Sequence, residues 1–143
     1  MLLRDRRGSM YAWIAALMLF VGIPLSSLSI DVARLMYVRT HLQTATDAAC
    51  QAAADALDVP TFRESGTRQI NPTLARSQAS MVFSATLQDA SAVQFSPGLA
   101  VSIAGAATAY CTGTATVAHF VPMTPSMNAI VRTVSEMSVR TLP

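Results

Sequence analysis

The chain has 143 residues and a formal net charge of +2, and only 13% of its residues are charged, which is low for a soluble globular protein. All ten basic residues are arginines, and the seven that follow residue 9 are dispersed and balanced by seven acidic residues. This distribution excludes a basic patch for nucleic acid and favours a chain with a membrane segment.

Residues 10–30 form an uncharged, mostly apolar segment. At about 1.5 Å per residue, a helix of this length covers roughly the 30 Å hydrocarbon core of a bilayer. Tyr11 and Trp13 suit one membrane boundary, where aromatic side chains gather. Pro24 predicts a kink or a loosened turn, because proline cannot donate a backbone hydrogen bond.

Charge predicts the orientation of this span. Three of the four charged residues in the first nine positions are arginines, whereas Arg34 beyond the span is opposed by Asp31. The positive-inside rule therefore predicts a cytoplasmic basic tail of residues 1–9, a transmembrane helix of residues 10–30 and an extracytoplasmic, periplasmic domain of residues 31–143, anchored in the cell (inner) membrane.

A cleaved signal peptide shows a similar N-terminal pattern. Ser27, Leu28 and Ser29 make a poor small-x-small cleavage site, and the helical pattern continues through them. We therefore expect the span to be retained. A helix buried in a soluble core is disfavoured by the length of the apolar run.

The predicted helix continues to about residue 57, because no Gly or Pro interrupts residues 31–57. Apolar or small residues recur there at spacings of three and four, which places them on one helix face. They are Leu35, Val38, Leu42, Ala45, Ala49, Ala52 and Ala56. The alanines permit close approach of another helix or a sheet, although high helix propensity explains them equally well.

Residues 58–71 carry a proline, a glycine and mixed charge, which predicts a surface loop. Asn71 and Pro72 then suit the N-cap and first turn of a second helix, which we expect to end near Asp89.

Beyond this helix the apolar pattern changes to a period of two, which indicates a first long strand that includes the alternating residues 99–104, and further strands in residues 114–121 and 130–139. Gly98 and Gly113 stand where turns are expected. The predicted fold class is α+β. The long transmembrane helix continues into an extracytoplasmic helix, and a small antiparallel sheet of three or four strands has one face covered by this helix and the second helix.

Both cysteines belong to the predicted extracytoplasmic part, Cys50 on the long helix and Cys111 at the end of the first long strand. In an oxidising compartment a disulfide between them would close a loop of roughly 60 residues and contribute about 4 kcal/mol in the chain-entropy model. Two buried free thiols that act as small hydrophobic groups are the alternative.

No nucleotide-binding, dinucleotide-binding or serine-hydrolase motif occurs in the sequence. His41, expected on the solvent face of the long helix, and His119, expected in a strand, lack Cys or His neighbours at ligand spacing. We therefore expect no catalytic site, cofactor, metal or small-molecule substrate.

A further pattern links the basic tail to the long helix. It comprises Arg6-Arg7-Gly8, the apolar span, Asp31, Arg34-Leu35, Tyr37, Leu42-Gln43 and Thr46-Asp47-Ala48-Ala49 before an alanine run. In this combination, residues 6–57 resemble the N-terminal module of the TadE/TadG-like proteins of Flp (tight-adherence) pilus assembly. Members processed like prepilins have Glu at the fifth position after the cleavage glycine, where this chain has Trp13. The resemblance therefore favours a membrane-retained TadG-type component over a cleaved TadE-type minor pilin.

The resemblance implies a structural or assembly component of a pilus or other cell-envelope complex, with the lipid bilayer and other membrane or envelope subunits as partners. The alternative is an accessory single-span subunit that stabilises an unrelated respiratory or photosynthetic membrane complex. Either role needs a contact surface, and we expect it on the long helix just outside the membrane, where polar pairs lie one turn apart. The candidate interface residues are Asp31, Arg34, Leu42, Gln43, Asp47, Ala48 and Ala52.

Overall fold

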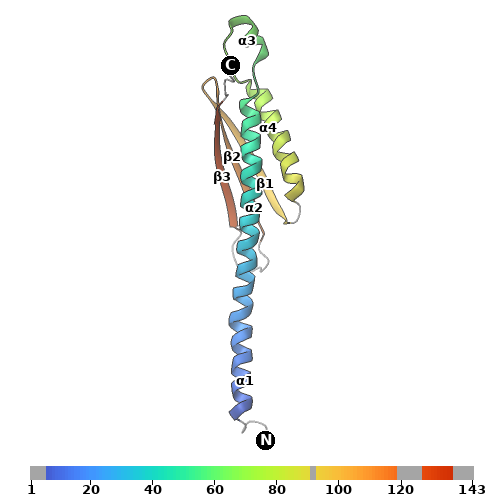
Figure 1. Cartoon of the computed structure of the whole chain (residues 1–143), viewed down its shortest axis with the longest axis vertical. Helices are drawn as coiled ribbons and strands as arrows, with labels where there is room; N and C mark the ends of the chain where they lie inside the picture. The colour runs from blue at the N-terminus through green and yellow to red at the C-terminus, as the bar shows by residue number, and fades with distance from the viewer. Residues whose placement is uncertain (1–5, 91–92, 119–126, 137–143) are drawn as a thin grey trace, which may run out of the picture.

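The computed structural model describes residues 6–90, 93–118 and 127–136. One long helix runs along most of the rod, and a sheet and a second helix gather around its C-terminal half (Figure 1). The long helix consists of α1 (Arg6–Leu17), a π-helical turn η1 (Met18–Gly22) and α2 (Ile23–Ala54), which follow one another without a break. It ends slightly before residue 57, the end that the sequence predicts.

Pro24 explains the π-helical turn, since its ring crowds the carbonyl group four residues earlier and its nitrogen has no proton to donate. The helix responds by widening in η1, immediately before the proline. The Ser26 hydroxyl donates to the Gly22 carbonyl oxygen at 2.8 Å. The loosened turn predicted from the sequence is thus confirmed.

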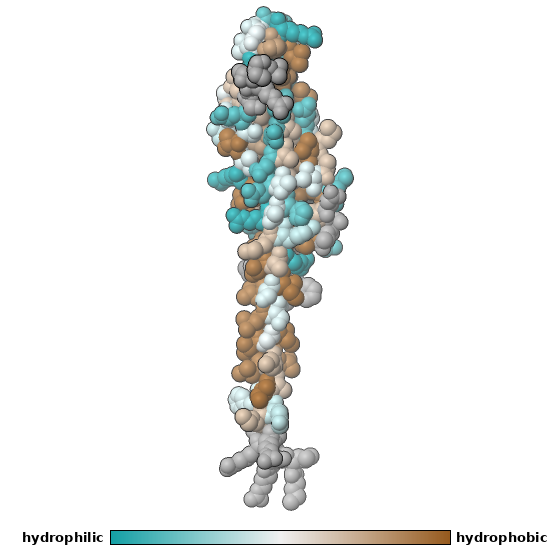
Figure 2. Space-filling view, in the orientation of Figure 1, coloured by the Kyte–Doolittle hydropathy of each residue, from teal (hydrophilic) through white to brown (hydrophobic). Residues whose placement is uncertain are grey.

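The N-terminal half of the long helix is apolar and uncovered. Among the described residues, Met10–Ala54 is one helix long and apolar enough to cross a membrane, and none of its most apolar window is buried by the rest of the chain. Figure 2 shows hydrophobic residues over this part of the rod and hydrophilic ones over much of the folded end. The structure therefore has a candidate single membrane span joined directly to a folded domain.

The segment predicted as a loop contains a short helix, α3 (Val59–Ser65), so that prediction is wrong in part. The Thr61 hydroxyl donates to the Asp58 carboxylate at 2.9 Å in its first turn. Gly66 ends the helix at φ 69°, a left-handed conformation that costs glycine little. A helix this short has too few turns to show a period in the sequence.

The second predicted helix is confirmed as α4 (Pro72–Leu87), followed by a 3₁₀ turn, η2 (Gln88–Ala90). Asn71 is its N-cap, because its side-chain oxygen accepts from the backbone N–H groups of Thr73 and Leu74, each at 3.1 Å. This helix packs lengthwise against α2.

Three strands form an antiparallel sheet in the order β1 (Phe95–Ala104), β2 (Thr108–Val117) and β3 (Met127–Glu136). The predicted antiparallel meander is confirmed. The turns predicted at Gly98 and Gly113 are wrong, since both glycines lie inside strands. Gly105, at φ 69°, lies between β1 and β2 instead. The end of the third predicted strand, residues 137–139, lies outside the described residues.

The core lies between α2 and one face of the sheet. Every second residue of β2 is buried there, and all but the last are small: Ala109, Cys111, Gly113, Ala115 and Val117. A Cβ added to Gly113 would collide with the Thr46 hydroxyl oxygen and lie 3.3 Å from Leu42 Cδ1. The glycine is therefore required by the close approach of the helix to the sheet, and not by a turn.

Candidate functional site on the long helix

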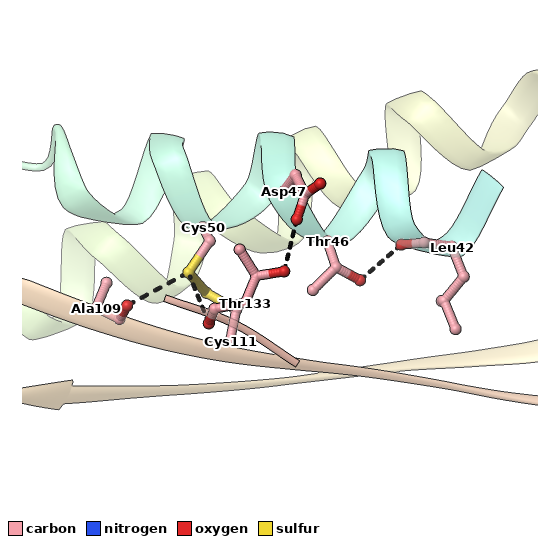
Figure 3. Close-up of a disulfide and its surroundings, with 7 residues drawn as sticks. All are labelled: Leu42, Thr46, Asp47, Cys50, Ala109, Cys111 and Thr133. Atoms are coloured by element: carbon pink, nitrogen blue, oxygen red, sulfur yellow. Dashed lines mark hydrogen bonds between the residues drawn. A yellow bond between two sulfur atoms is a disulfide. The ribbon is translucent and has the colours of Figure 1, made fainter. Parts of the chain in front are cut away.

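A disulfide joins α2 to the middle of the sheet. Cys50 and Cys111 are bonded, with their Cα atoms 5.6 Å apart and both side chains buried (Figure 3). Cys111 belongs to the centre of β2, and not to the end of a strand as the sequence suggested. Cys50 Sγ lies 3.5 Å from the Ala109 carbonyl oxygen and 3.6 Å from that of Thr133. A bridged sulfur has no proton to donate, so these are packing contacts that centre the disulfide between β2 and β3.

Asp47 ties α2 to the third strand. The Thr133 hydroxyl donates to Asp47 Oδ1, one turn before the disulfide on the helix (Figure 3). Asp47 remains exposed even though it makes this bond. The side chain therefore fixes the edge of the helix–sheet contact and also forms part of the molecular surface.

Leu42 is not a surface residue, which corrects its inclusion in the predicted interface. Its side chain is 0% exposed and lies over Gly113 of β2. The Thr46 hydroxyl donates to the Leu42 carbonyl oxygen at 2.7 Å, so the one buried polar side chain of this contact is satisfied within the helix (Figure 3). Leu42 thus belongs to the core.

The other predicted interface residues differ in how far they are exposed. Asp31 and Arg34 are half-buried near the end of the apolar segment, Ala48 and Ala52 are half-buried higher on α2, and Gln43 is exposed. None of these positions is enclosed by the chain itself. The structure therefore leaves them accessible at least in part.

A polar strip of α2 stays uncovered by both the sheet and α4. We call it the open face, and its exposed residues are Thr40, Gln43, Thr44, Asp47 and Gln51. The sequence prediction missed Thr40, Thr44 and Gln51, although their spacing of three and four from Gln43 and Asp47 was a usable signal. Thr40 and Thr44 each donate to the carbonyl group four residues earlier. Their hydroxyl protons are thus used inside the helix, while the amides and the carboxylate face outward.

The alanines of α2 serve two internal contacts. Ala45, Ala49, Ala53 and Ala54 are buried, and α2 packs against both the sheet and α4. Both neighbours, the sheet and α4, belong to this chain. The alanines by themselves are therefore no evidence for an external partner.

The histidines provide no metal site among the described residues. His41 is half-buried with its ring centroid 4.3 Å from that of Tyr37, so the prediction of a solvent-facing histidine is only partly right. The other histidine, His119, lies outside the described residues. No group of three or more His, Cys, Asp or Glu that could hold a metal ion occurs in the part of the chain that the structure describes.

Comparison with known proteins identifies the N-terminal module. Residues 8–56 match the model of the Tad family, described as Flp pilus-assembly TadE/G-like, which confirms the resemblance seen in the sequence. The match covers α1 from Gly8 onward, η1 and α2, together with the two residues that follow. No curated protein and no solved structure matches this chain.

Proposed function

We propose that this chain is a non-catalytic, single-pass membrane component that helps to assemble or hold together a Flp-type pilus or another cell-envelope complex. The observation that carries the proposal is the extent of the family match. It covers nearly the whole long helix, which includes both the apolar span and the segment that packs against the sheet. A pilus-assembly family and a membrane helix both suit a protein that works by packing against neighbours.

The structure suggests how such a component would work. The helix passes from the apolar segment into the domain without a hinge, and only a π-helical turn interrupts its α-helical geometry. The disulfide and the bond between Thr133 and Asp47 fix the sheet to this helix. The open face would therefore stand at a set height and angle above the membrane, which suits a docking surface for another subunit.

The interface that we propose includes Gln43 and Asp47 of the open face. Ala48 and Ala52 lie beside it, while Leu42 is left out because it is buried. Asp31 and Arg34 lie nearer the membrane but on a different side of the helix, since 16 and 13 residues separate them from Asp47 at 3.6 residues per turn, so they would form a separate part of the contact. Amide and carboxylate groups at the centre would provide directional hydrogen bonds, and the small alanines would let a second helix come close.

We also propose that the N-terminus is cytoplasmic and the domain extracytoplasmic. The arginines before the span support this orientation. The disulfide supports it independently, because disulfides persist mainly in oxidising compartments. A reporter that becomes active only in the cytoplasm, fused after Pro143, should stay silent. Reporter activity would contradict the orientation without affecting the proposed fold.

Copurification after mild detergent extraction tests the assembly role. We expect components of a pilus secretion machine to be recovered with the wild-type chain. Recovery of cofactor-bearing respiratory or photosynthetic subunits would support the alternative role instead. Replacing Ala48 or Ala52 by Leu should reduce partner recovery by about tenfold, because overpacking a close contact typically costs about 1–3 kcal/mol.

Ala85→Leu is the matched control, because Ala85 is an exposed alanine on the other long helix of the domain, α4. This variant should copurify like the wild type. All variants must be present in the membrane at equal amounts for the comparison to count. Normal partner recovery with both Ala48→Leu and Ala52→Leu would show that the proposed interface is wrong.

A further inference from the structure

A cavity of about 320 Å³ opens at the end of the domain that faces the apolar segment. It lies between α2 and the start of β3, which run side by side there (Figure 1), and is lined by Leu35, Arg39, Asn128, Ala129 and Ile130. We call it the juxtamembrane cavity. None of its residues belongs to the open face or to the disulfide.

The lining combines apolar walls with two hydrogen-bond donors. Leu35, Ala129 and Ile130 provide the apolar surface, and Ile130 is 58% exposed. Asn128 accepts a hydrogen bond from the Thr116 hydroxyl at 3.1 Å through its side-chain oxygen. This contact directs its NH₂ group, which can only donate, away from Thr116.

Among the described residues that line the cavity, Arg39 is the one that carries a charge. It is exposed, and no described residue forms a hydrogen bond or an ion pair with it. The nearest acidic residues on the same helix, Asp31 and Asp47, are eight positions away in either direction, beyond the three or four positions at which helical side chains pair. The cavity is therefore locally positive, and its donors suit the oxygens of an anion.

The height of the cavity matches a membrane surface. Arg39 follows the last residue of the uncharged segment, Ile30, by nine positions, or about 13 Å of helix. The headgroup layer of a bilayer extends about 5–7 Å beyond the hydrocarbon core. The remaining gap of about 6–8 Å is within reach of an arginine side chain, which leans toward the N-terminus of its helix and extends its charged end to the interface.

We propose that the juxtamembrane cavity binds the headgroup of an anionic phospholipid from the leaflet on the domain side. The Arg39 guanidinium and the Asn128 amide would hold the phosphodiester oxygens, and Leu35 and Ile130 would contact the glycerol and the upper acyl chain. The inference rests on the proposed membrane span and not on the assembly role. A bound lipid would fix the distance between the domain and the bilayer.

Site-resolved photocrosslinking of the full chain in nanodiscs tests this proposal. Phosphatidylglycerol and phosphatidylcholine probes, each with the same photoreactive group near the headgroup, are compared by mass-spectrometric mapping of the labelled peptides. We expect the phosphatidylglycerol probe to label the peptides that contain Leu35 and Ile130 preferentially. Arg39→Gln should reduce that preference about fivefold, since one arginine contributes about 1 kcal/mol near anionic lipid.

Arg63→Gln is the control, because Arg63 is an exposed arginine on α3, at the end of the rod far from the apolar segment (Figure 1). It should label like the wild type, and Asn128→Leu should lower labelling by both probes, because both headgroups carry the phosphodiester oxygens that the amide would bind. Mapping by peptide separates this site from lipid bound at the basic tail. Unchanged labelling in Arg39→Gln would overturn the proposal, as would displacement of the lipid probe by millimolar inorganic phosphate. Either result would leave the copurification test unaffected.

Discussion

Both halves of the long helix carry apolar residues, but these side chains differ in size and burial. Between Met10 and Ile30 the side chains are large and uncovered, and Phe20 is 80% exposed. Between Asp31 and Ala54 the apolar residues are mostly small and buried, and Ala45 and Ala49 are 0% exposed. Large exposed apolar side chains suit lipid, whereas small ones allow backbones to approach closely. Side-chain size thus separates the two environments, as does the hydropathy shown in Figure 2.

The contrast also predicts what stabilises each half. The N-terminal half satisfies its backbone within the helix and gains from being in lipid. The C-terminal half buries little apolar surface per residue, because alanine and glycine side chains are small. Its attachment to the sheet therefore depends on close fit and on the bond between Cys50 and Cys111.

Removing the disulfide should have the largest effect and should affect only the C-terminal half. The bond closes a loop with a sequence separation of 61 residues. Cys50→Ala combined with Cys111→Ala should lower the free energy of unfolding of the domain by about 4 kcal/mol in the chain-entropy model. Denaturant unfolding of the full chain in detergent measures the loss.

The wild-type chain under reducing conditions is the control for this experiment and should show the same loss of stability. Helicity from the apolar segment should persist after the domain has unfolded in both samples. A change of less than about 1 kcal/mol would mean that packing alone holds α2 to the sheet.

Sequence patterns predicted the features that depend on local chemistry. The apolar run predicted the candidate membrane span, Pro24 predicted the loosened turn, and Asn71 before Pro72 predicted the start of α4. The alternation of apolar residues with a period of two predicted the strands. Gly113 was misassigned because glycine also occurs where a helix lies close to a strand, and only the fold shows that Thr46 lies above it.

The candidate site was predicted only in part for a related reason. Helical spacing placed Leu42 and Ala49 on one face correctly, but it does not reveal whether that face meets the chain's own sheet or another protein. The structure buries both residues. Asp47 was identified because it lies one helical turn from Gln43 and belongs to the pattern of the TadE/TadG-like resemblance, whereas its bond to Thr133 joins residues 86 positions apart, a distance that no local pattern spans.

Two glycines provide a smaller but sharper test: Gly22 in the N-terminal half of the helix, and Gly113 in the strand that packs against its C-terminal half. Gly113→Ala should destabilise the domain by about 1–3 kcal/mol, because the new methyl group would collide with Thr46 and force the helix from the sheet. Gly22→Ala should leave domain stability unchanged, since nothing lies within 4 Å of the added carbon. Denaturant unfolding of both variants, followed by a signal from the sheet, measures the difference.

A second substitution identifies the cause of that loss. Thr46→Ala removes the hydroxyl that the new methyl group would meet, and this hydroxyl bonds only to the carbonyl oxygen of Leu42 in its own helix. Added to Gly113→Ala, it should restore part of the lost stability, giving a favourable coupling of about 1 kcal/mol between the two sites. Without coupling, the loss would come from the strand backbone and not from contact with the helix. If Gly113→Ala proved as neutral as Gly22→Ala, helix and sheet would not pack as closely as the structure places them, and side-chain size would no longer distinguish the two halves.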